Sequence, residues 1–373
     1  MVESGKNHIR ISLKREIDDS YDIFFGSYLM NQIANDLAMA PIASRYAIVT
    51  DSNVGPLYAH ALETALRDVS ISFTTFTFPA GEQNKNIETC MSVMSGMSSN
   101  GFGRDSAILA LGGGVVGDMS GFMAAVFNRG IPYVQIPTTI LAQADSSIGG
   151  KTAVDMEGYK NLIGAFKQPE KVYIDVATLE SLSERDYCSG LAETVKHGII
   201  QDAEFFKYLQ ANADKIIGKD KEYLLYISRR NCTIKGNVVE IDPHEKGLRR
   251  ILNYGHTAGH AIETLSNFEL THGEAVAIGM MVAGRIANQL GYFHPADLDD
   301  QGRLLDAIGL PIVIPDTISN DDIIGVMGKD KKSKDGKARY VLPVKIGQMH
   351  EFDGIYATHV ANEVVMEALQ KTR

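Results

Sequence analysis

Residues 107–117 read AILALGGGVVG, a short apolar segment that runs directly into three consecutive glycines. The segment has the length and composition of a buried strand, and residues 112–117 fit the pattern G-x-G-x-x-G. Glycines at these positions let the backbone approach a pyrophosphate, and the free N–H groups at the start of the next helix bind anions. The stretch therefore predicts a strand–turn–helix unit that holds a dinucleotide. A tight glycine turn without a ligand is the alternative.

The acidic residue that usually accompanies this pattern is missing. In dinucleotide-binding folds an acid about 20 residues further on binds the ribose, but residues 130–141 contain neither Asp nor Glu. The ribose partner must then come from another strand. We favour Asp51, which directly follows the apolar run 46–50, because a residue at the carboxyl end of a strand faces the ligand crevice. A role of Asp51 in capping a turn or a helix is the alternative.

Strand-like and helix-like segments alternate in the first half of the chain. The further strand candidates are residues 46–50, 71–78 and 133–136. A helical spacing of apolar residues covers residues 87–99, and this alternation predicts a parallel sheet with helices on both faces. Later in the chain, long helical patterns cover residues 191–201, 223–240 and 275–290. We expect a Rossmann-like α/β domain at residues 1–178, an α-helical domain at residues 179–373, and a ligand cleft between them.

Three histidines, His256, His260 and His272, fall within 17 residues. His256 and His260 share one face of a helix, and His272 precedes a new apolar helix. Two imidazoles and a carboxylate are a common ligand set for catalytic zinc, and Glu193 is an acid in an otherwise apolar helical segment. One histidine alone would more often be a hydrogen-bonded core residue. Three together indicate a metal site, but their spacing leaves open which two bind the metal.

Several basic residues stand in apolar or glycine-rich surroundings. Lys151 follows two glycines, Lys196 lies one helical turn after Glu193, and Lys235 lies inside a helical segment. A buried ammonium without a counter-charge is costly, so these lysines indicate an anionic ligand. The lysine-rich run at residues 329–332 would by itself be a solvated loop.

The composition narrows the class of protein. The chain has 373 residues and a net charge of -10, which argues against a non-specific nucleic-acid binder. Its three cysteines are widely separated, so we expect a reduced, cytoplasmic setting without disulfides. The first 19 residues lack an apolar signal core, and the apolar run 275–284 is too short to span a bilayer.

Taken together, these motifs resemble those of the 3-dehydroquinate synthases, a family of sugar phosphate cyclases. The first half carries GGGVVGD at residues 112–118 and PTTILAQADSSIGGKT at residues 137–152. The second half carries LAETVK at residues 191–196, GHTAGH at residues 255–260 and HGEAV at residues 272–276. The resemblance covers nearly the whole chain, from about residue 21 to residue 347.

The resemblance implies a role for each matching residue. The metal, Zn²⁺ or Co²⁺, would be bound by Glu193, His256 and His272. NAD would be bound by Asp51, Asn53, Glu82, Lys85, Gly114, Val115, Asp118, Thr138, Thr139, Lys151 and Lys160. Ser181 is a further candidate for this site. The substrate would contact Asp145, Lys151, Asn161, Lys196, Lys235, Arg249, Asn253, His260 and Lys331 of the Lys331–Lys332 pair. Arg129 would reach the site of a neighbouring subunit, which implies a homodimer.

The implied activity is the conversion of 3-deoxy-D-arabino-heptulosonate 7-phosphate into 3-dehydroquinate and phosphate, the second step of the shikimate pathway. Cyclases of secondary metabolism and metal-dependent alcohol dehydrogenases of the glycerol dehydrogenase type are the alternatives. Arg249, Asn253 and His260 have the identities found in dehydroquinate synthases and favour the first activity. The complete set of metal-type and cationic residues argues against a non-catalytic regulator.

Overall fold

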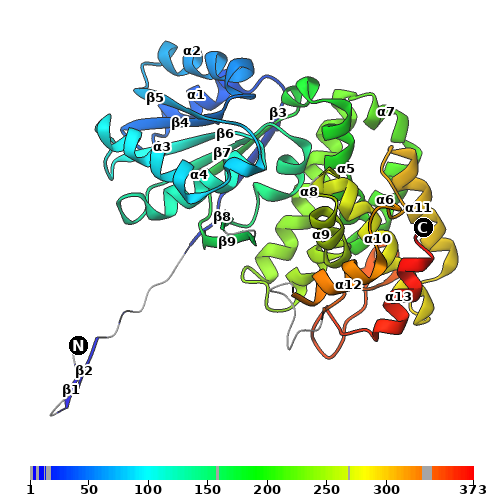
Figure 1. Cartoon of the computed structure of the whole chain (residues 1–373). Coiled ribbons are helices and arrows are strands. Elements are labelled where there is room, and N and C mark those ends of the chain that lie inside the picture. Colours follow the sequence, from blue (N-terminus) through cyan, green and yellow to red (C-terminus); the bar gives the residue numbers. More distant parts are fainter. Residues whose placement is uncertain are drawn as a thin grey trace.

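The computed structural model describes residues 3–5, 8–11, 13, 18–156, 159–267, 269–329 and 338–373. A layered α/β unit and a helical unit lie side by side (Figure 1). The first unit contains the blue and cyan part of the chain, and the second contains the green to red part. Two short strands near the N-terminus, β1 (Glu3–Gly5) and β2 (His8–Arg10), pair antiparallel.

A six-stranded sheet forms the centre of the α/β unit. Its strands are β3 (Asp22–Gly26), β4 (Arg45–Asp51), β5 (Phe73–Phe78), β6 (Ser106–Gly112), β7 (Tyr133–Pro137) and β10 (Lys171–Asp175). All neighbouring strands are parallel, and their order is β3-β10-β7-β6-β4-β5. The strand β6 is buried along its whole length, as expected for an apolar strand that is covered on both faces.

Helices cover both faces of this sheet (Figure 1). They are α1 (Met30–Met39), α2 (His60–Asp68), α3 (Ile87–Ser99) and α4 (Gly114–Val126). Alternate residues of β6 belong to two different cores: Leu109 packs with residues of α1 and α2, whereas Ile108 and Ala110 pack with residues of α3 and α4. The expected parallel sheet between two layers of helices is confirmed.

The strand order places a ligand crevice between β4 and β6. The strands β5-β4-β6-β7-β10 follow the doubly wound order 2-1-3-4-5, in which the direction of winding reverses between β4 and β6. Ligands of such sheets bind outside the carboxyl ends of the strands at this reversal. Here β4 ends at Asp51, and β6 ends at Gly112, directly before α4. Asp51 and the glycine-rich turn, which the sequence analysis selected for dinucleotide binding, therefore lie at the same edge of the sheet.

A hairpin extends from the α/β unit toward the helical unit. It consists of β8 (Lys151–Met156) and β9 (Tyr159–Phe166), which pair antiparallel and pack against α4. Figure 1 shows the hairpin at the side of the sheet that faces the helices. It carries Lys151, Lys160 and Asn161, so three residues with predicted binding roles come from one short element.

The helical unit packs around two long helices, α5 and α10, most of whose residues are buried. Its helices are α5 (Glu184–Gln201), α6 (Ala203–Ala211), α7 (Ala213–Ile217), α8 (Lys221–Ile241), α9 (His256–Leu265), α10 (His272–Gln289), α11 (Pro295–Ala307), α12 (Asn320–Lys329) and α13 (Asn362–Gln370). Residues 275–284 of α10 are all buried, so this apolar run belongs to the core of the unit. Among the described helices, none is both long and apolar enough to cross a membrane.

Short helices of three to six residues connect these elements. They are η1 (Gly55–Ala59), η2 (Glu82–Asn84), η3 (Phe127–Arg129), η4 (Ala142–Ser146), η5 (Val176–Ser181) and η6 (Leu248–Asn253). The expected division after residue 178 falls in η5, between the end of β10 and the start of α5. The position of the domain boundary itself stays a prediction.

The expectation that the second half is all-α was wrong in one detail. The strands β11 (Pro343–Lys345) and β12 (Gln348–Met349) form a small antiparallel pair. Gly347 turns the chain between them with a φ of +89°, a conformation that glycine adopts without strain. Strands of two and three residues are too short to show the alternation from which a strand is predicted.

Candidate functional site

Glycines allow the helices α9 and α10 to pack backbone against backbone. A Cβ atom on Gly279 would lie 2.0 Å from the carbonyl oxygen of Gly255, a distance that real side chains do not reach. Gly255 itself turns the chain into α9 with a φ of +80°. This contact brings together His256 and His272, which are the first residues of the two helices. A capping box formed by Thr271 and Glu274 fixes the start of α10.

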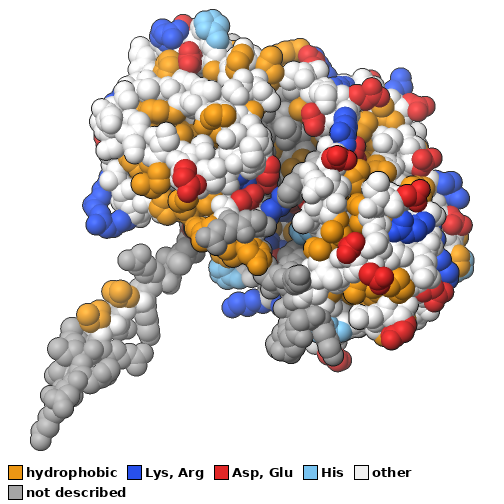
Figure 2. All heavy atoms as spheres, viewed as in Figure 1, with side chains coloured by type: hydrophobic (Ala, Val, Ile, Leu, Met, Phe, Trp, Pro, Cys, Tyr) orange, Lys and Arg blue, Asp and Glu red, His pale blue; other side chains and the backbone are white. Residues whose placement is uncertain are grey.

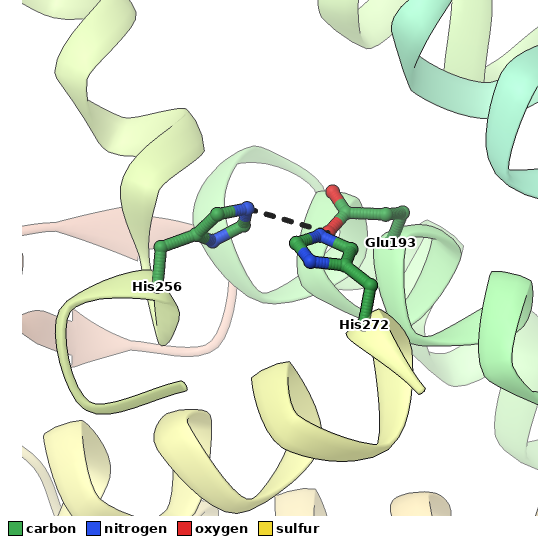
Figure 3. Close-up of side chains that lie close together, drawn as sticks. All are labelled: Glu193, His256 and His272. Carbon is green, nitrogen blue, oxygen red and sulfur yellow. Dashed lines mark ion pairs between the residues drawn. The ribbon is translucent and has the colours of Figure 1, made fainter. Parts of the chain in front are cut away.

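Three side chains converge where these helices meet α5 (Figure 3). Oε1 of Glu193 lies 3.6 Å from Nε2 of His256 and 3.7 Å from Nε2 of His272. Figure 3 shows both imidazole rings turned toward this carboxylate. His260 lies beside the group, with its ring centroid 5.1 Å from that of His256 and 5.8 Å from that of His272. The structure therefore brings together all four residues that the sequence analysis considered as metal ligands.

The group of Glu193, His256 and His272 fits a divalent metal. Their donor atoms lie within 4.8 Å of one another, and two imidazole nitrogens with one carboxylate oxygen suit Zn²⁺ or Co²⁺. Oε1 of Glu193 is buried and has no hydrogen-bond partner among the described residues, as expected for an atom that binds an ion. Burial lowers the pKa of His272, but Glu193 and Glu263 outweigh this effect and raise it to about 9. The surrounding charges thus favour a cation at this point.

Behind the metal group lies a buried set of fixed charges. Lys235 lies with its Nζ 2.8 Å from Oδ1 of Asp145 and also donates to the main-chain oxygen of Asp145. Lys196 pairs with Glu193 one helical turn away. Burial lowers the pKa of Lys235, whereas the pKa of Asp145 is held below its usual range because Lys235 and Lys196 outweigh the effect of burial. Each of these buried lysines is thus paired with a carboxylate, and the four charges are held in fixed positions.

Arg249 connects the two units. Its guanidinium donates to the carbonyl oxygen of Gly149 at 2.9 Å and to that of Pro243 at 2.6 Å. Only 2% of its surface is exposed, so a large cation is buried where the loop before β8 meets η6. Arg249 therefore fixes the position of the glycines that precede Lys151.

A carboxylate that the sequence analysis missed joins two predicted substrate residues. Glu245 accepts hydrogen bonds from Lys151 and from the side-chain amide of Asn253. The backbone of Glu245 has a φ of +57°, an uncommon value for a residue with a side chain. Lys151 and Asn253 thus meet at one point although they come from β8 and η6.

The carboxyl edge of the sheet where β4 and β6 end is here called the nucleotide edge. It contains Asp51 and the glycine-rich turn, the two features that the sequence predicted to bind NAD. Oδ1 of Asp51 accepts hydrogen bonds at 2.8 Å from the backbone N–H groups of Asn53 and Val54. This is the turn-capping role that the sequence analysis gave as the alternative, and it leaves the carboxylate at the carboxyl edge of β4. Oγ1 of Thr138 is buried without a hydrogen-bond partner in the part of the chain that the structure describes. A Cβ atom on Gly113 would lie 3.0 Å from Thr139, so glycine keeps this edge open to a pyrophosphate.

A second set of polar residues borders this edge. Nζ of Lys85 lies 2.7 Å from Oδ2 of Asp118 on α4 and 2.7 Å from Oδ1 of Asn161 on β9. Oε1 of Glu82 lies 3.9 Å from Nζ of Lys85 and 3.7 Å from Nζ of Lys160, a lysine of β9. Burial lowers the pKa of Lys85, but Asp118 and Glu82 outweigh it and raise the value above the usual range. These residues form one polar network between the sheet and the hairpin.

Comparison with known proteins decides the family. Two family models match the chain: "3-dehydroquinate synthase N-terminal" over residues 75–189 and "3-dehydroquinate synthase C-terminal" over residues 190–333. The chain belongs to the 3-dehydroquinate synthase family. The 3-dehydroquinate synthase of Acetivibrio thermocellus is 47% identical over 333 residues, which are 89% of this chain and 92% of that protein.

Solved structures of other cyclases share the fold of this 3-dehydroquinate synthase family member. A 2-deoxy-scyllo-inosose synthase in complex with carbaglucose-6-phosphate, NAD⁺ and Co²⁺ has a TM-score of 0.87 and 27% identity, over 94% of this chain and 96% of that one. The 2-epi-5-epi-valiolone synthase of Streptomyces hygroscopicus with NAD⁺ and Zn²⁺ has a TM-score of 0.87 and 28% identity. That match covers 97% of this chain and 99% of the other chain.

Three further residues have roles predicted from the sequence. Arg129 is exposed at the end of η3 with a φ of +71°. Ser181 accepts a hydrogen bond from the hydroxyl of Tyr58 at 2.6 Å. Lys331 lies outside the described residues. The roles of all predicted site residues stay predictions, since proximity alone does not assign a function.

The sequence analysis also missed Glu263, a second buried carboxylate beside the metal group. It lies on α9, three residues after His260 and seven after His256. Residues at these spacings share one face of a helix, so the helical pattern of the histidine segment was the signal that could have identified it.

Proposed function

We propose that this chain is an NAD- and metal-dependent 3-dehydroquinate synthase. It converts 3-deoxy-D-arabino-heptulosonate 7-phosphate into 3-dehydroquinate and phosphate. The observation that carries this proposal is the convergence of the carboxylate–histidine group with the buried charges of Asp145, Lys196 and Lys235. Lys196 and Lys235 are held in place by Glu193 and Asp145, and a substrate that carries both a carboxylate and a phosphate can accept further charge-assisted hydrogen bonds from them.

We assign Glu193, His256 and His272 as the ligands of Zn²⁺ or Co²⁺. When bound, this metal supplies Lewis-acid activation of substrate hydroxyls. The chain itself keeps the ligands in place, because both histidines begin helices that glycines hold in contact. His260 lies next to the ligands, where it can bind substrate and transfer protons.

We assign the edge formed by Asp51, Gly114, Val115, Thr138 and Thr139 to NAD, together with Asn53, Glu82, Lys85, Asp118 and Lys160. NAD supplies reversible hydride acceptance, so it is required but not consumed. The polar network of Lys85, Asp118 and Asn161 joins this edge to the hairpin that carries Lys151 and Lys160. The hairpin therefore places substrate and cofactor residues on one element.

We assign the remaining charged and polar residues to the substrate: Asp145, Lys151, Asn161, Lys196, Lys235, Arg249, Asn253, His260 and Lys331. Buried cations that are held by the protein before binding need little reorganisation when charge develops in the reaction. Positioning and electrostatics are thus the main tasks of these side chains.

Three further proposals concern the surroundings of the reaction. The protein is cytoplasmic, since its widely separated cysteines are unpaired. It acts as a homodimer in which Arg129 reaches the neighbouring site; the exposure of Arg129 supports this role. The cofactor domain ends near residue 178, and the metal- and substrate-binding domain follows it.

A related cyclase activity on another sugar phosphate is the second candidate. The two cyclases with a TM-score of 0.87 carry the observation that favours it, because they share nearly the whole fold. Their identities of 27% and 28% are well below the 47% of the Acetivibrio thermocellus enzyme, which favours the dehydroquinate synthase activity.

The deciding experiment offers the protein the heptulosonate phosphate and a neutral heptulose phosphate that lacks the carboxylate. We expect release of phosphate and formation of 3-dehydroquinate from the acid only, without accumulation of NADH. Equal turnover of the neutral sugar would assign the chain to the other cyclases. NADH that accumulates in step with product would instead favour an alcohol dehydrogenase.

A further inference from the structure

Glu263 is a buried carboxylate that contacts both halves of the site. Its surface is 4% exposed, and it lies on α9 between the metal group and the hairpin. Oε2 of Glu263 lies 3.6 Å from Nδ1 of His272, and Oε1 lies 2.8 Å from Nζ of Lys160. One carboxylate thus joins a metal ligand of the helical unit to a residue of β9.

The contact with His272 determines which ring nitrogen faces the metal. Nε2 of His272 points to Glu193, and Nδ1 points to Glu263. A histidine binds metal through an unprotonated nitrogen, while the other nitrogen carries a proton that is usually donated to a carboxylate or a carbonyl. Glu263 is placed to accept that proton and so to hold the ring in the metal-binding orientation.

The contact with Lys160 extends to the nucleotide edge. Nζ of Lys160 also lies 3.7 Å from Oε1 of Glu82, which in turn lies 3.9 Å from Nζ of Lys85. Lys85 is paired with Asp118 on α4, the helix that begins at the glycine-rich turn. A continuous path of opposite charges therefore runs from the metal group to the helix that faces the nucleotide.

We infer that Glu263 is a positioning residue that couples metal binding to NAD binding through its two carboxylate oxygens. The inference rests on the proposed metal and NAD sites. A metal fixes His272 and therefore Glu263, which holds Lys160 and the hairpin in the place that the nucleotide requires. The coupling is reciprocal, because each ligand must strengthen the binding of the other by the same factor.

A different placement of the metal would give Glu263 another role. His260, Glu263 and His272 also have donor atoms within 4.8 Å of one another, so Glu263 could itself be a ligand. Oε1 of Glu193 is buried without a hydrogen bond among the described residues, whereas Oε1 of Glu263 is paired with Lys160. The atom that lacks a partner is the better candidate for the ion, and this assigns Glu263 to orientation of His272.

The test measures binding and needs no turnover. Co²⁺ is titrated into the metal-free full chain, with and without saturating NAD, and binding is followed by the visible absorption of the metal. The proteins are the wild type, Glu193→Gln, Glu263→Gln, Lys160→Met and the control Glu204→Gln. Glu204 is a suitable control because it forms an exposed ion pair with Lys207 on α6, away from the site.

We expect NAD to tighten Co²⁺ binding to the wild type by at least about fivefold, a typical coupling between linked sites. Glu263→Gln should weaken Co²⁺ binding by about 10- to 100-fold, as loss of a partner of a metal-bound histidine does. It should also abolish the effect of NAD. Lys160→Met removes a residue that is also assigned to NAD, so it is measured at an NAD concentration shown to saturate this variant, where the coupling should be lost. Glu204→Gln should match the wild type throughout.

The outcomes separate this inference from the proposed metal site. If Glu193→Gln loses Co²⁺ but Glu263→Gln binds it like the wild type with the coupling intact, only the inference fails. If Glu263→Gln loses the metal completely and Glu193→Gln retains it, Glu263 is a ligand and both proposals are wrong.

The double variant Glu263→Gln/Lys160→Met guards against misfolding, because it removes both members of the ion pair together. Its circular dichroism should match the wild type, and its Co²⁺ binding should not respond to NAD. A response equal to that of the wild type would overturn the inference.

Discussion

Replacing Gly279 by alanine tests whether the packing of α9 against α10 builds the metal group. A Cβ atom at this position would lie 2.0 Å from the carbonyl oxygen of Gly255 and 2.7 Å from the nitrogen of Gly259. Both contacts are with backbone, so no side chain can rotate away. Contacts of Cβ atoms below 3.0 Å essentially never occur, and the helices must therefore separate by about 1 Å.

The expected effects follow from this displacement. Overpacking of a tightly packed core costs about 1–3 kcal/mol, and the upper part of this range applies because the backbone itself must move. Metal ligands must be held within about 0.5 Å of their productive positions, so a shift of about 1 Å should also weaken metal binding. We expect the free energy of unfolding of Gly279→Ala to fall by about 2–3 kcal/mol and its affinity for Co²⁺ to fall at least tenfold.

Urea unfolding and Co²⁺ titration measure the two effects, and Gly325→Ala is the matched control. Gly325 lies inside α12, where a Cβ atom would meet no described atom within 4 Å. The same substitution should stabilise the chain there by up to about 1 kcal/mol, because alanine favours helix more than glycine does. Wild-type stability and metal affinity of Gly279→Ala would refute the reasoning.

Three further predictions concern single residues. His272→Ala should lose bound metal and activity together, whereas His260→Ala should keep its metal and lose turnover; metal analysis and kinetics of the purified variants decide this. Arg249→Ala should reduce substrate turnover or affinity at least about tenfold, because a charged hydrogen bond contributes about 1.5–3 kcal/mol, and NAD titration should be nearly unchanged. Burial raises the pKa of the thiols of Cys90 and Cys232 to about 12, so both should stay protonated and resist iodoacetamide at neutral pH until the chain is unfolded, as mass spectrometry can show.

Local pattern was sufficient to predict three strands inside the sheet, but not β10, which also lies inside it. β4, β6 and β7 are short apolar runs that end at turn residues, and α3 has the bounds that its helical spacing indicated. The edge strand β3 was not predicted, because its residues are only half-buried and show no clear alternation. Nor does local pattern give the strand order, which depends on how distant segments pack.

In the candidate site, too, some residues could be predicted from local pattern and others could not. The histidine segment and Glu193 could be chosen because metal ligands need particular residue types at close spacing. Glu245 and Glu263 could not be chosen as easily, since isolated acids are usually solvated and their partners Lys151 and Lys160 lie about 100 residues away. The sequence left two roles open for Asp51, and the structure shows that its carboxylate caps the turn at residues 51–54.

The start of α9 at His256 and the start of α10 at His272 place two helix N-termini at the same point. The N-terminal end of a helix carries a partial positive charge, so the two macrodipoles add to the field of a metal bound there. This combined positive field disfavours a cation, and the buried negative charge of Glu193 offsets that repulsion. The same field stabilises an oxyanion beside the metal. A substrate hydroxyl at this position would therefore ionise more readily than the metal alone could achieve, which makes the direction of two helix axes part of the acid–base chemistry.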